Sequence, residues 1–381
     1  MNSSGTNPGA DKKITYSDIT DFEELYESSY KCRRGVGWKP STKHHTLNGV
    51  ERCLEMEAEL RNGTWKHGKP RPIMIRYPKK REGLSIPFRD RVYQRALNDL
   101  ALYPMMTKSF ILDNCACQKG KGTDFARKRM KKHLWKHFCH HGRKGYVLQV
   151  DIRGYYPNMR HDVVDRCFAR HLPPEIHAAA MSVLKHQYKG ETGYNPGSQM
   201  VQIAGISVLD GLDHHIKEQL YVRHYIRYMD DLWMLFASKE EAEAVLLEVK
   251  AELEKIGFSI HEEKTHIREL GKGFLFLGYW YHMTATGKIV MTINSDSVRH
   301  ERRKLRRMAS RVAGGLMPMG KMRECYESWR NFASIGNCYR LAKRMDRYYH
   351  QLVEEIRNGN IQKPGHVTCR REDDGHAEGV Q

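Results

Sequence analysis

The sequence lacks long apolar runs, and its cysteines do not follow the pattern of a secreted protein. No stretch of about eighteen apolar residues is present, and no signal-peptide core opens the chain. The nine cysteines are odd in number and scattered, which argues against a disulfide framework. Cys115 and Cys117, with Cys139, His140 and His141 downstream, lack a CxxC pair and the spacing of a zinc site. We therefore expect reduced thiols, no membrane segment and a cytoplasmic protein.

Acidic residues are too few to balance the basic ones. There are 64 Lys and Arg residues against 45 Asp and Glu, which gives a formal net charge of +19. Self-repulsion of like charge opposes compaction, so the excess predicts a polyanionic partner. Nucleic acid meets that requirement, while an anionic membrane surface and plain solubility stay open as alternatives. The chain has 381 residues, 40% of them hydrophobic, and can bury the core of one large or two medium domains.

Neither internal repeats nor a low-complexity linker interrupt the alternation of helical and strand patterns. Hydrophobic spacing predicts helices over residues 48–65, 87–106, 202–220, 295–311 and 321–353. Short β-rich runs predict a hairpin over 222–236 and strands over 71–77, 145–151, 257–261, 274–281 and 288–293. We expect mobile ends, because residues 1–17 and 358–381 are polar and rich in glycine. The predicted fold class is α+β with a helical C-terminal part.

Three aspartates are the strongest candidates for chemistry. Asp151 ends a predicted strand, and Asp230 and Asp231 lie at the tip of the predicted hairpin. Aspartate pairs also favour ordinary turns, because their side chains bond nearby backbone. However, the apolar strands on both sides predict a buried tip, and buried carboxylates are costly unless a cation binds them. Polymerases use two Mg²⁺ ions held by clustered carboxylates, so we expect a Mg²⁺ site here.

Several segments around these aspartates follow one another in an informative order. They are SIPFRDRVYQRAL (85–97), LQVDIRGYYPNM (148–159), YMDD (228–231), HEEKTHI (261–267) and FLGYWY (276–281). In this order they resemble the motifs of bacterial reverse transcriptases of the group II intron and diversity-generating retroelement type. The resemblance implies a right-hand polymerase with fingers at 18–143, a palm that carries the catalytic site at 144–285 and a helical thumb at 286–357.

The resemblance also implies roles for individual residues in catalysis. Asp151, Asp230 and Asp231 would bind Mg²⁺, and Lys264 would protonate the departing pyrophosphate. A surface lysine is the alternative explanation of Lys264.

Substrate binding is implied for a second set of residues. Arg81 and Lys80 would grip the triphosphate of the incoming nucleotide, although exposed cations in a KKRE segment are the ordinary alternative. Tyr156 stands at the steric-gate position, which favours deoxynucleotides, and neighbouring Tyr155 is a second candidate for that position. Tyr228 opens the YMDD segment and joins the same set.

Two more pairs complete the set of site residues. Gly197 and Gln202 would contact template and nucleotide, although Val201 replaces a serine that the related enzymes carry. Leu277 and Gly278 would form the primer grip, and a β-bulge glycine is the alternative for Gly278.

Two basic segments predict contacts with phosphates, and solvated charged faces are the alternative. One is the helix over 297–311, which would follow a duplex. The other would suit structured RNA and contains Lys119, Lys121, Arg127, Lys128, Arg129, Lys131 and Lys132.

The predicted function is that of an RNA-directed DNA polymerase. It would extend a DNA or RNA primer on an RNA template with dNTPs and Mg²⁺, which yields cDNA. A structured noncoding RNA and an accessory protein are expected partners, either in antiviral defence or in the mutagenic copying of a diversity-generating retroelement. Two alternatives remain. Tyr156 disfavours an RNA-dependent RNA polymerase, and the retained carboxylates with Arg81 disfavour a catalytically idle, maturase-like RNA-binding scaffold.

Overall fold

The computed structural model describes residues 13–75, 81–195 and 198–361, and the chain divides into two compact units, Met1–Glu269 and Leu270–Gln381. Most of both predicted mobile ends lies outside the described residues. At the inner edges, the side chain of Thr15 caps helix α1 (Tyr16–Ile19), and Ile361 is buried in the core of the second unit. The inner edges of both predicted ends, residues 13–17 and 358–361, are thus part of the described structure.

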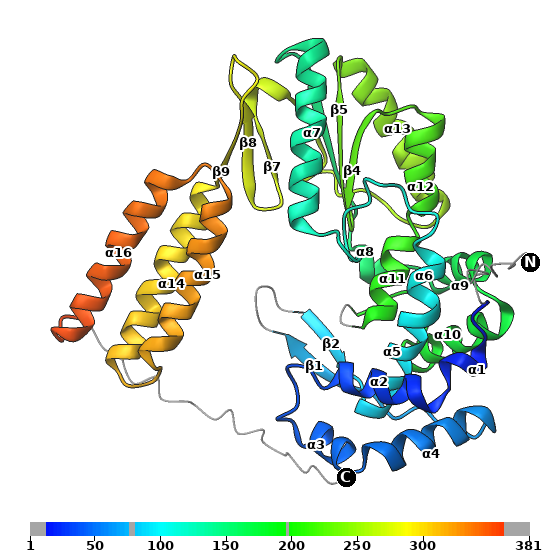
Figure 1. Ribbon diagram of the computed structural model, residues 1–381. Helices are drawn as coiled ribbons and strands as arrows, with labels where there is room; N and C mark the ends of the chain where they lie inside the picture. The colour runs from blue at the N-terminus through cyan, green and yellow to red at the C-terminus, as the bar shows by residue number, and fades with distance from the viewer. Residues whose placement is uncertain (1–12, 76–80, 196–197, 362–381) are drawn as a thin grey trace, which may run out of the picture. The chain divides into compact units, whose positions relative to one another are not determined.

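A four-stranded antiparallel sheet lies toward one end of the first unit (Figure 1). Its strands, in spatial order, are β4 (His224–Tyr228), β5 (Asp231–Phe236), β3 (Tyr146–Asp151) and β6 (His266–Glu269). Helix α13 (Lys239–Lys255) packs on β3, β5 and β6, and helix α7 (Thr123–His141) packs on β4. Because helices cover the sheet, five consecutive residues of β5 are buried instead of every second one.

The strand predictions for this sheet are partly confirmed. The hairpin and the strand that ends at Asp151 are present. Residues 257–261 are not a strand, because Ile260 makes only an isolated bridge with Ile152. The partner of β3 on that side is instead β6, which the sequence pattern did not reveal.

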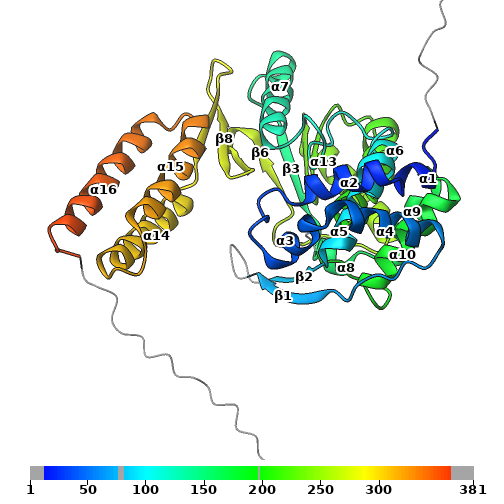
Figure 2. The same ribbon diagram turned by 60° about the horizontal axis from the view of Figure 1, so that its bottom comes forward.

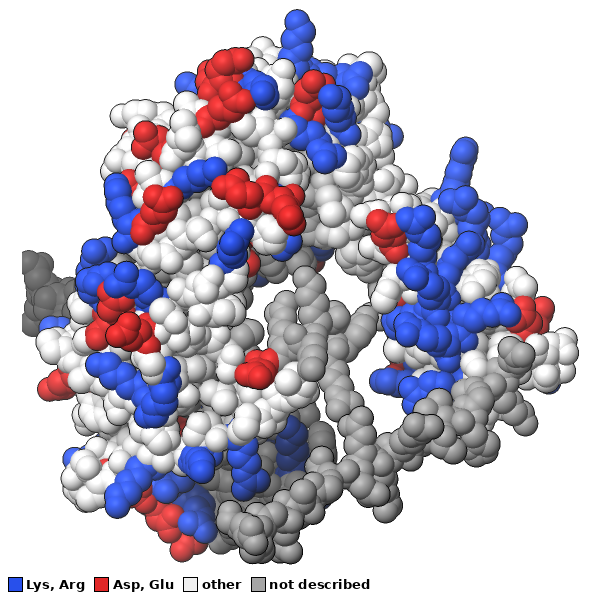
Figure 3. All heavy atoms as spheres, turned by 180° about the vertical axis from the view of Figure 1, so that it is seen from behind, with Lys and Arg blue, Asp and Glu red and all other residues white. Residues whose placement is uncertain are grey.

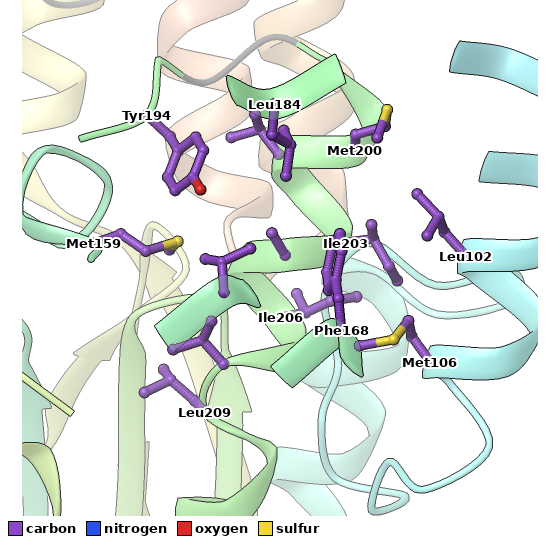
Figure 4. Packing of buried hydrophobic residues seen from close by; sticks show 14 of the residues in the cluster. Leu102, Met106, Met159, Phe168, Leu184, Tyr194, Met200, Ile203, Ile206 and Leu209 are labelled. Atoms are coloured by element: carbon purple, nitrogen blue, oxygen red, sulfur yellow. The ribbon is translucent and has the colours of Figure 1, made fainter. Parts of the chain in front are cut away.

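Most of the remaining helices of the first unit gather at one end of it, whereas α12 (Asp210–His214) lies beside α13 (Figures 1 and 2). The gathered helices are α2 (Phe22–Cys32), α3 (Pro40–Leu47), α4 (Gly49–Arg61), α5 (Phe88–Leu97), α6 (Tyr103–Met106), α8 (Tyr155–Asn158), α9 (His161–His171), α10 (Pro174–Gln187) and α11 (Gln199–Ser207). A continuous core joins them to the sheet, and Figure 4 shows Met106, Phe168 and Ile203, from three helices, in that core.

The long predicted helices contain irregular turns. The helix predicted over 87–106 is α5 and α6 joined by a π-helical turn, Asn98–Leu102. The helix predicted over 202–220 is α11 and α12 followed by a second π-helical turn, His215–Gln219. Such turns add one residue per helical turn and often lie near functional sites.

A β-hairpin precedes α5. Its strands are β1 (Arg71–Ile75) and β2 (Arg81–Ser85), with Ile75 opposite Arg81. All five residues of β1 are exposed, so this hairpin projects from the core. The sequence pattern predicted β1 but not β2.

The second unit is a small sheet followed by three helices. The sheet contains β7 (Phe274–Phe276), β8 (Tyr279–Met283) and β9 (Ile289–Ile293), after a short 3-10 turn, Leu270–Lys272. The helices are α14 (Ser295–Ala313), α15 (Met319–Ile335) and α16 (Tyr339–Arg357). The single helix predicted over 321–353 is thus two helices, and Asn337 between them accepts a hydrogen bond from the backbone N–H of Met291. Both units combine helices with antiparallel strands, so the predicted α+β class is confirmed.

Among the described residues, no helix is both long and apolar enough to cross a membrane.

Candidate active site

The pairing of three strands brings the predicted aspartates to one end of the sheet. Asp151, the last residue of β3, lies directly opposite Asp231, the first residue of β5. Tyr228 also pairs with Asp231, so Met229 and Asp230 form a two-residue loop between β4 and β5. Met229 has a φ of 58°, a left-handed conformation that is uncommon for a residue with a side chain.

The prediction of a buried hairpin tip is wrong. Asp231 is exposed, and Asp151 and Asp230 are half-buried, whereas the five residues that follow Asp231 are buried. The carboxylates lie at the ends of the strands, which reach solvent. The apolar residues lie further along the strands, where the protein covers them. The carboxylates are therefore accessible to substrate from the rim of the core.

The carboxyl group of Asp231 has a raised pKa. Although Asp231 is exposed as a whole residue, protein atoms crowd its carboxylate, and the resulting loss of hydration, together with the negative charges of Asp230 and Asp151, raises its pKa to about 6. Lys264 opposes this shift. Its Nζ lies 3.3 Å from Oδ1 of Asp151. A cation near these oxygens would relieve the repulsion further.

The donor set suits a hard divalent cation, because carboxylate oxygens are the protein ligands that Mg²⁺ prefers. Within the described ranges, no group of three or more His, Cys, Asp or Glu side chains is placed so that it could hold a metal ion. The three aspartates therefore suit Mg²⁺ through the chemistry of their oxygens and through their positions at the ends of the strands. Asp151, Asp230 and Asp231 are the residues that would contribute ligands, and water and substrate oxygens complete such sites.

A buried arginine holds the loop between β4 and β5. The guanidinium of Arg227 is fully buried and donates to both carboxylate oxygens of Asp213, at 2.6 to 2.9 Å. It also donates to the carbonyl oxygen of Met229 at 3.2 Å and to that of Ile206 in α11 at 2.8 Å. Tyr225 adds a hydroxyl donor to Asp213 at 2.6 Å. The turn that carries Asp230 is thus bonded to the core by a charged donor.

A second buried carboxylate supports the same strand from outside the sheet. The backbone N–H of Arg227 donates to the carbonyl oxygen of Asp113 at 3.0 Å. The carboxylate of Asp113 accepts two hydrogen bonds from Arg129, and His133 lies 3.2 Å away. Burial alone would raise the pKa of Asp113, but the bonds from His133 and Arg129 lower it to about 2.

Sequence reasoning missed Arg227, Asp213 and Asp113. A usable signal existed for Arg227, because a charged residue within an apolar strand is rarely buried unless it is paired. Its partner Asp213 lies on a helix 14 positions earlier, and no local pattern reveals that pairing.

The two adjacent tyrosines have different environments. Tyr155 is buried, and its hydroxyl donates to the carbonyl oxygen of Gly205 in α11. Tyr156 is half-buried and packs over Gly205, where an added Cβ would lie 3.0 Å from the hydroxyl. Burial raises the pKa of Tyr156 most, and the charges of Cys117 and Asp230 add to the rise. Tyr156 is therefore on the site side of α8, and Tyr155 belongs to the core.

The other predicted substrate-binding residues are placed in part. Arg81 opens β2, whereas Lys80 and Gly197 lie outside the described residues. Gln202 is exposed on α11 and lines a cavity with Cys117, whose sulfur is 3.5 Å from that of Met229. Tyr228 is half-buried at the end of β4.

The predicted primer-grip pair belongs to the second unit. Leu277 and Gly278 form the two-residue loop between β7 and β8, and both have positive φ, 45° and 84°. A side chain at position 278 would meet Phe332 of α15, because its Cβ would lie 3.1 Å from Cζ. The glycine is thus part of a tight hairpin turn and not of a β-bulge.

The two basic segments differ from each other. Figure 3 shows Lys and Arg gathered over the helices of the second unit. The exposed members on α14 include Arg299, Arg302, Arg303, Arg306 and Arg307. The other predicted face is partly wrong, because Lys121 donates to three backbone carbonyl oxygens, Arg127 is buried beside Asp124, and Arg129 binds Asp113. Lys119, Lys128, Lys131 and Lys132 are exposed as predicted.

The family model "Reverse transcriptase (RNA-dependent DNA polymerase)" matches residues 77–281, more than half of the chain. The chain therefore belongs to the reverse transcriptase family. With the mixed helices and antiparallel sheets, this match confirms the predicted right-hand polymerase fold and, at the level of the family, the enzyme class of RNA-directed DNA polymerases. Reverse transcriptases use divalent metal ions. The group II intron, retroelement or defence subtype stays a prediction.

No curated protein matches the chain. Among solved structures, one similar chain is telomerase from Candida albicans in complex with a TWJ fragment of telomeric RNA, with 12% identity, a TM-score of 0.47 and coverage of 75% of this chain and 55% of that one. Another is apo telomerase from Candida tropicalis truncated from its C-terminal domain, with 12% identity, a TM-score of 0.44 and coverage of 59% and 54%. The chain spans little more than half the length of both.

Proposed function

We propose that the chain extends a primer on an RNA template with deoxynucleotides, with Mg²⁺ at Asp151, Asp230 and Asp231. The observation that carries the proposal is the direct pairing of Asp151 with Asp231 beside a two-residue loop, within the segment that matches the reverse transcriptase family. Mg²⁺ bound there would stabilise the attacking and leaving oxygens of the displacement.

The residues of the chain would supply the remaining chemistry. The ammonium of Lys264, whose Nζ lies 3.3 Å from Oδ1 of Asp151, would donate a proton to the departing pyrophosphate. Tyr156, next to Gly205, would exclude a ribose 2′-hydroxyl, which favours dNTPs. Arg81 and Lys80 would bind the triphosphate through phosphate oxygens. Tyr228, Gly197 and Gln202 would border the nucleotide.

The predicted parts of the hand belong to the same proposal, with fingers at 18–143, a palm at 144–285 and a thumb at 286–357. The arginines of α14 would bind phosphates of the duplex, and Leu277 and Gly278 would contact the primer. The RNA template would be part of a structured noncoding RNA, with an accessory protein as a further partner. The biological role would be antiviral defence or the mutagenic copying of a diversity-generating retroelement, and sequencing of copurified RNA distinguishes the two.

The test is Mg²⁺-dependent extension of a primed RNA template with dNTPs or with rNTPs. Asp230→Asn and Asp231→Asn should each abolish extension, whereas Asp162→Asn, a change at an exposed salt bridge to Arg160 and Arg166, should not. Unchanged extension in the first two variants contradicts the proposed site. A preference for rNTPs would instead identify an RNA polymerase. RNA binding without any synthesis would identify a scaffold.

A further inference from the structure

Helix α7 has an outer face that the proposed polymerase chemistry does not use. Its buried side chains are Ala126, Arg127, Met130, His133, Leu134 and His137, and His133 and His137 pack against His224 of β4. The opposite side of the helix faces solvent. Trp135 lies on that side with 59% of its surface exposed. A large exposed aromatic side chain on a helix that packs well on its other side indicates a binding function.

Cations surround Trp135 on this face. Lys131 and Lys132 are four and three positions before it, so both are its neighbours on the helix surface, and Lys128 lies two turns before it on the same side. All three are exposed, as is Lys136. We name Lys128, Lys131, Lys132, Trp135 and Lys136 the α7 outer face.

No acidic residue close in sequence offsets the positive charge of the α7 outer face. Between Asp124 and Asp151 the sequence contains no Asp or Glu, and Asp124 pairs with Arg127. A membrane surface is a poor fit, because interfacial helices bury a broad apolar face and this face offers one aromatic ring. An aromatic ring among lysines instead matches unpaired nucleotides, whose bases stack on aromatic side chains while phosphates bind cations.

We propose that the α7 outer face binds an unpaired segment of a folded RNA, with a base stacked on Trp135 and phosphates bound by the surrounding lysines. This inference rests on the proposed function, because it assigns a further contact to the RNA partner of the polymerase. Trp135 lies on the side of α7 that faces away from β4, whereas the aspartates lie at the end of β3 and at the loop between β4 and β5. A base bound there is therefore not the templating base, and the contact anchors the RNA without entering the reaction.

The test uses the full chain and two RNA probes, a hairpin with a loop of unpaired uridines and a fully paired RNA of equal length. Trp135→Ala should weaken binding of the looped hairpin by about tenfold, whereas Trp135→Phe, which keeps a ring, should retain most of the affinity. Binding of the paired RNA should change little in both variants. Lys131→Ala combined with Lys132→Ala should lower the slope of log affinity against log salt by about 1.4, or about 0.7 for each phosphate that is no longer neutralised.

Extension of a short, unstructured primed template separates this inference from the proposed function. Trp135→Ala should leave that extension unchanged. If the unmodified chain makes no DNA, the proposed function fails while the binding result still stands. Unchanged affinity of Trp135→Ala for the looped hairpin overturns the inference, as does an equal loss for both probes. It is also overturned if an acidic peptide binds as tightly as the hairpin and with the same dependence on Trp135, because the face would then be a protein-binding surface.

Discussion

Substituting Arg227 tests whether the buried ion pair positions the catalytic loop or only stabilises the fold. In Arg227→Met, the carboxylate of Asp213 stays buried but loses its charged partner, and Ile206 and Met229 lose a donor to their carbonyl oxygens. Breaking a buried ion pair from one side costs about 3 to 5 kcal/mol of unfolding free energy. That is a large share of the roughly 5 to 15 kcal/mol that stabilises a typical protein.

A matched double variant separates stability from positioning. Adding Asp213→Asn to Arg227→Met removes the uncompensated charge, and the amide oxygen at position 213 can still accept from Tyr225. We expect the double variant to regain most of the lost unfolding free energy. The carbonyl oxygen of Met229 stays without its charged donor in both variants. A hydrogen bond to a charged group contributes about 1.5 to 3 kcal/mol, which corresponds to roughly ten- to a hundredfold in kcat if the loop must be held for catalysis.

The assays are urea unfolding followed by circular dichroism, and single-turnover extension with saturating dNTP. The expected result for the double variant is near-normal stability with kcat reduced by at least about tenfold. Normal stability together with normal kcat would refute the reasoning, because the bond from Arg227 to the loop would then have no catalytic consequence. Arg227→Lys is a useful intermediate, since it keeps the charge but loses the bidentate geometry.

Three further outcomes are expected. Tyr156→Ala should increase incorporation of rNTPs relative to dNTPs by about tenfold, measured by competition on one template, because the ring that would meet the 2′-hydroxyl is gone. Lys264→Met should lower kcat by about a hundredfold with little change in KM for dNTP, and an unchanged kcat would exclude a role in proton transfer. Asp113 has a folded-state pKa of about 2, below its unfolded value near 4. Its contribution to the unfolding free energy is therefore fully present above about pH 4 and is lost as the pH falls through about 2. Unfolding free energy measured across that window should therefore fall less steeply in Asp113→Asn, and an unchanged slope would contradict the assignment.

Local sequence patterns predicted those parts of the structure that depend on local interactions. The strand that ends at Asp151 and the hairpin around Asp230 follow from short apolar runs interrupted by turn residues, and the structure confirms both. The residues 257–261 look similar in sequence but form no strand, because β6 takes the place beside β3. Which strand pairs with which is decided by tertiary contacts, and alternation of residues does not encode it.

Charge was harder to interpret than hydrophobicity. The seven cations between positions 119 and 132 appear as one basic surface in the sequence, yet Arg129 and Lys121 bind groups near Asp113 in the fold. A sequence shows how many cations a segment carries but not which carboxylate or carbonyl oxygen each one meets. For the same reason the sequence did not reveal the role of Asp213, which is to form a buried ion pair with Arg227.

The direct pairing of Asp151 with Asp231 also links catalysis to the accuracy of folding. Side chains along a strand alternate between the two faces of a sheet, so a slip of β3 by one residue against β5 would turn Asp151 to the face opposite Asp231. A chain with such a slip could keep most of its secondary structure and much of its compactness. It would have lost the pair of neighbouring carboxylates altogether. Recovery of DNA synthesis after refolding would thus report on correct strand alignment. Circular dichroism cannot distinguish the correct alignment from one in which β3 has slipped by one residue.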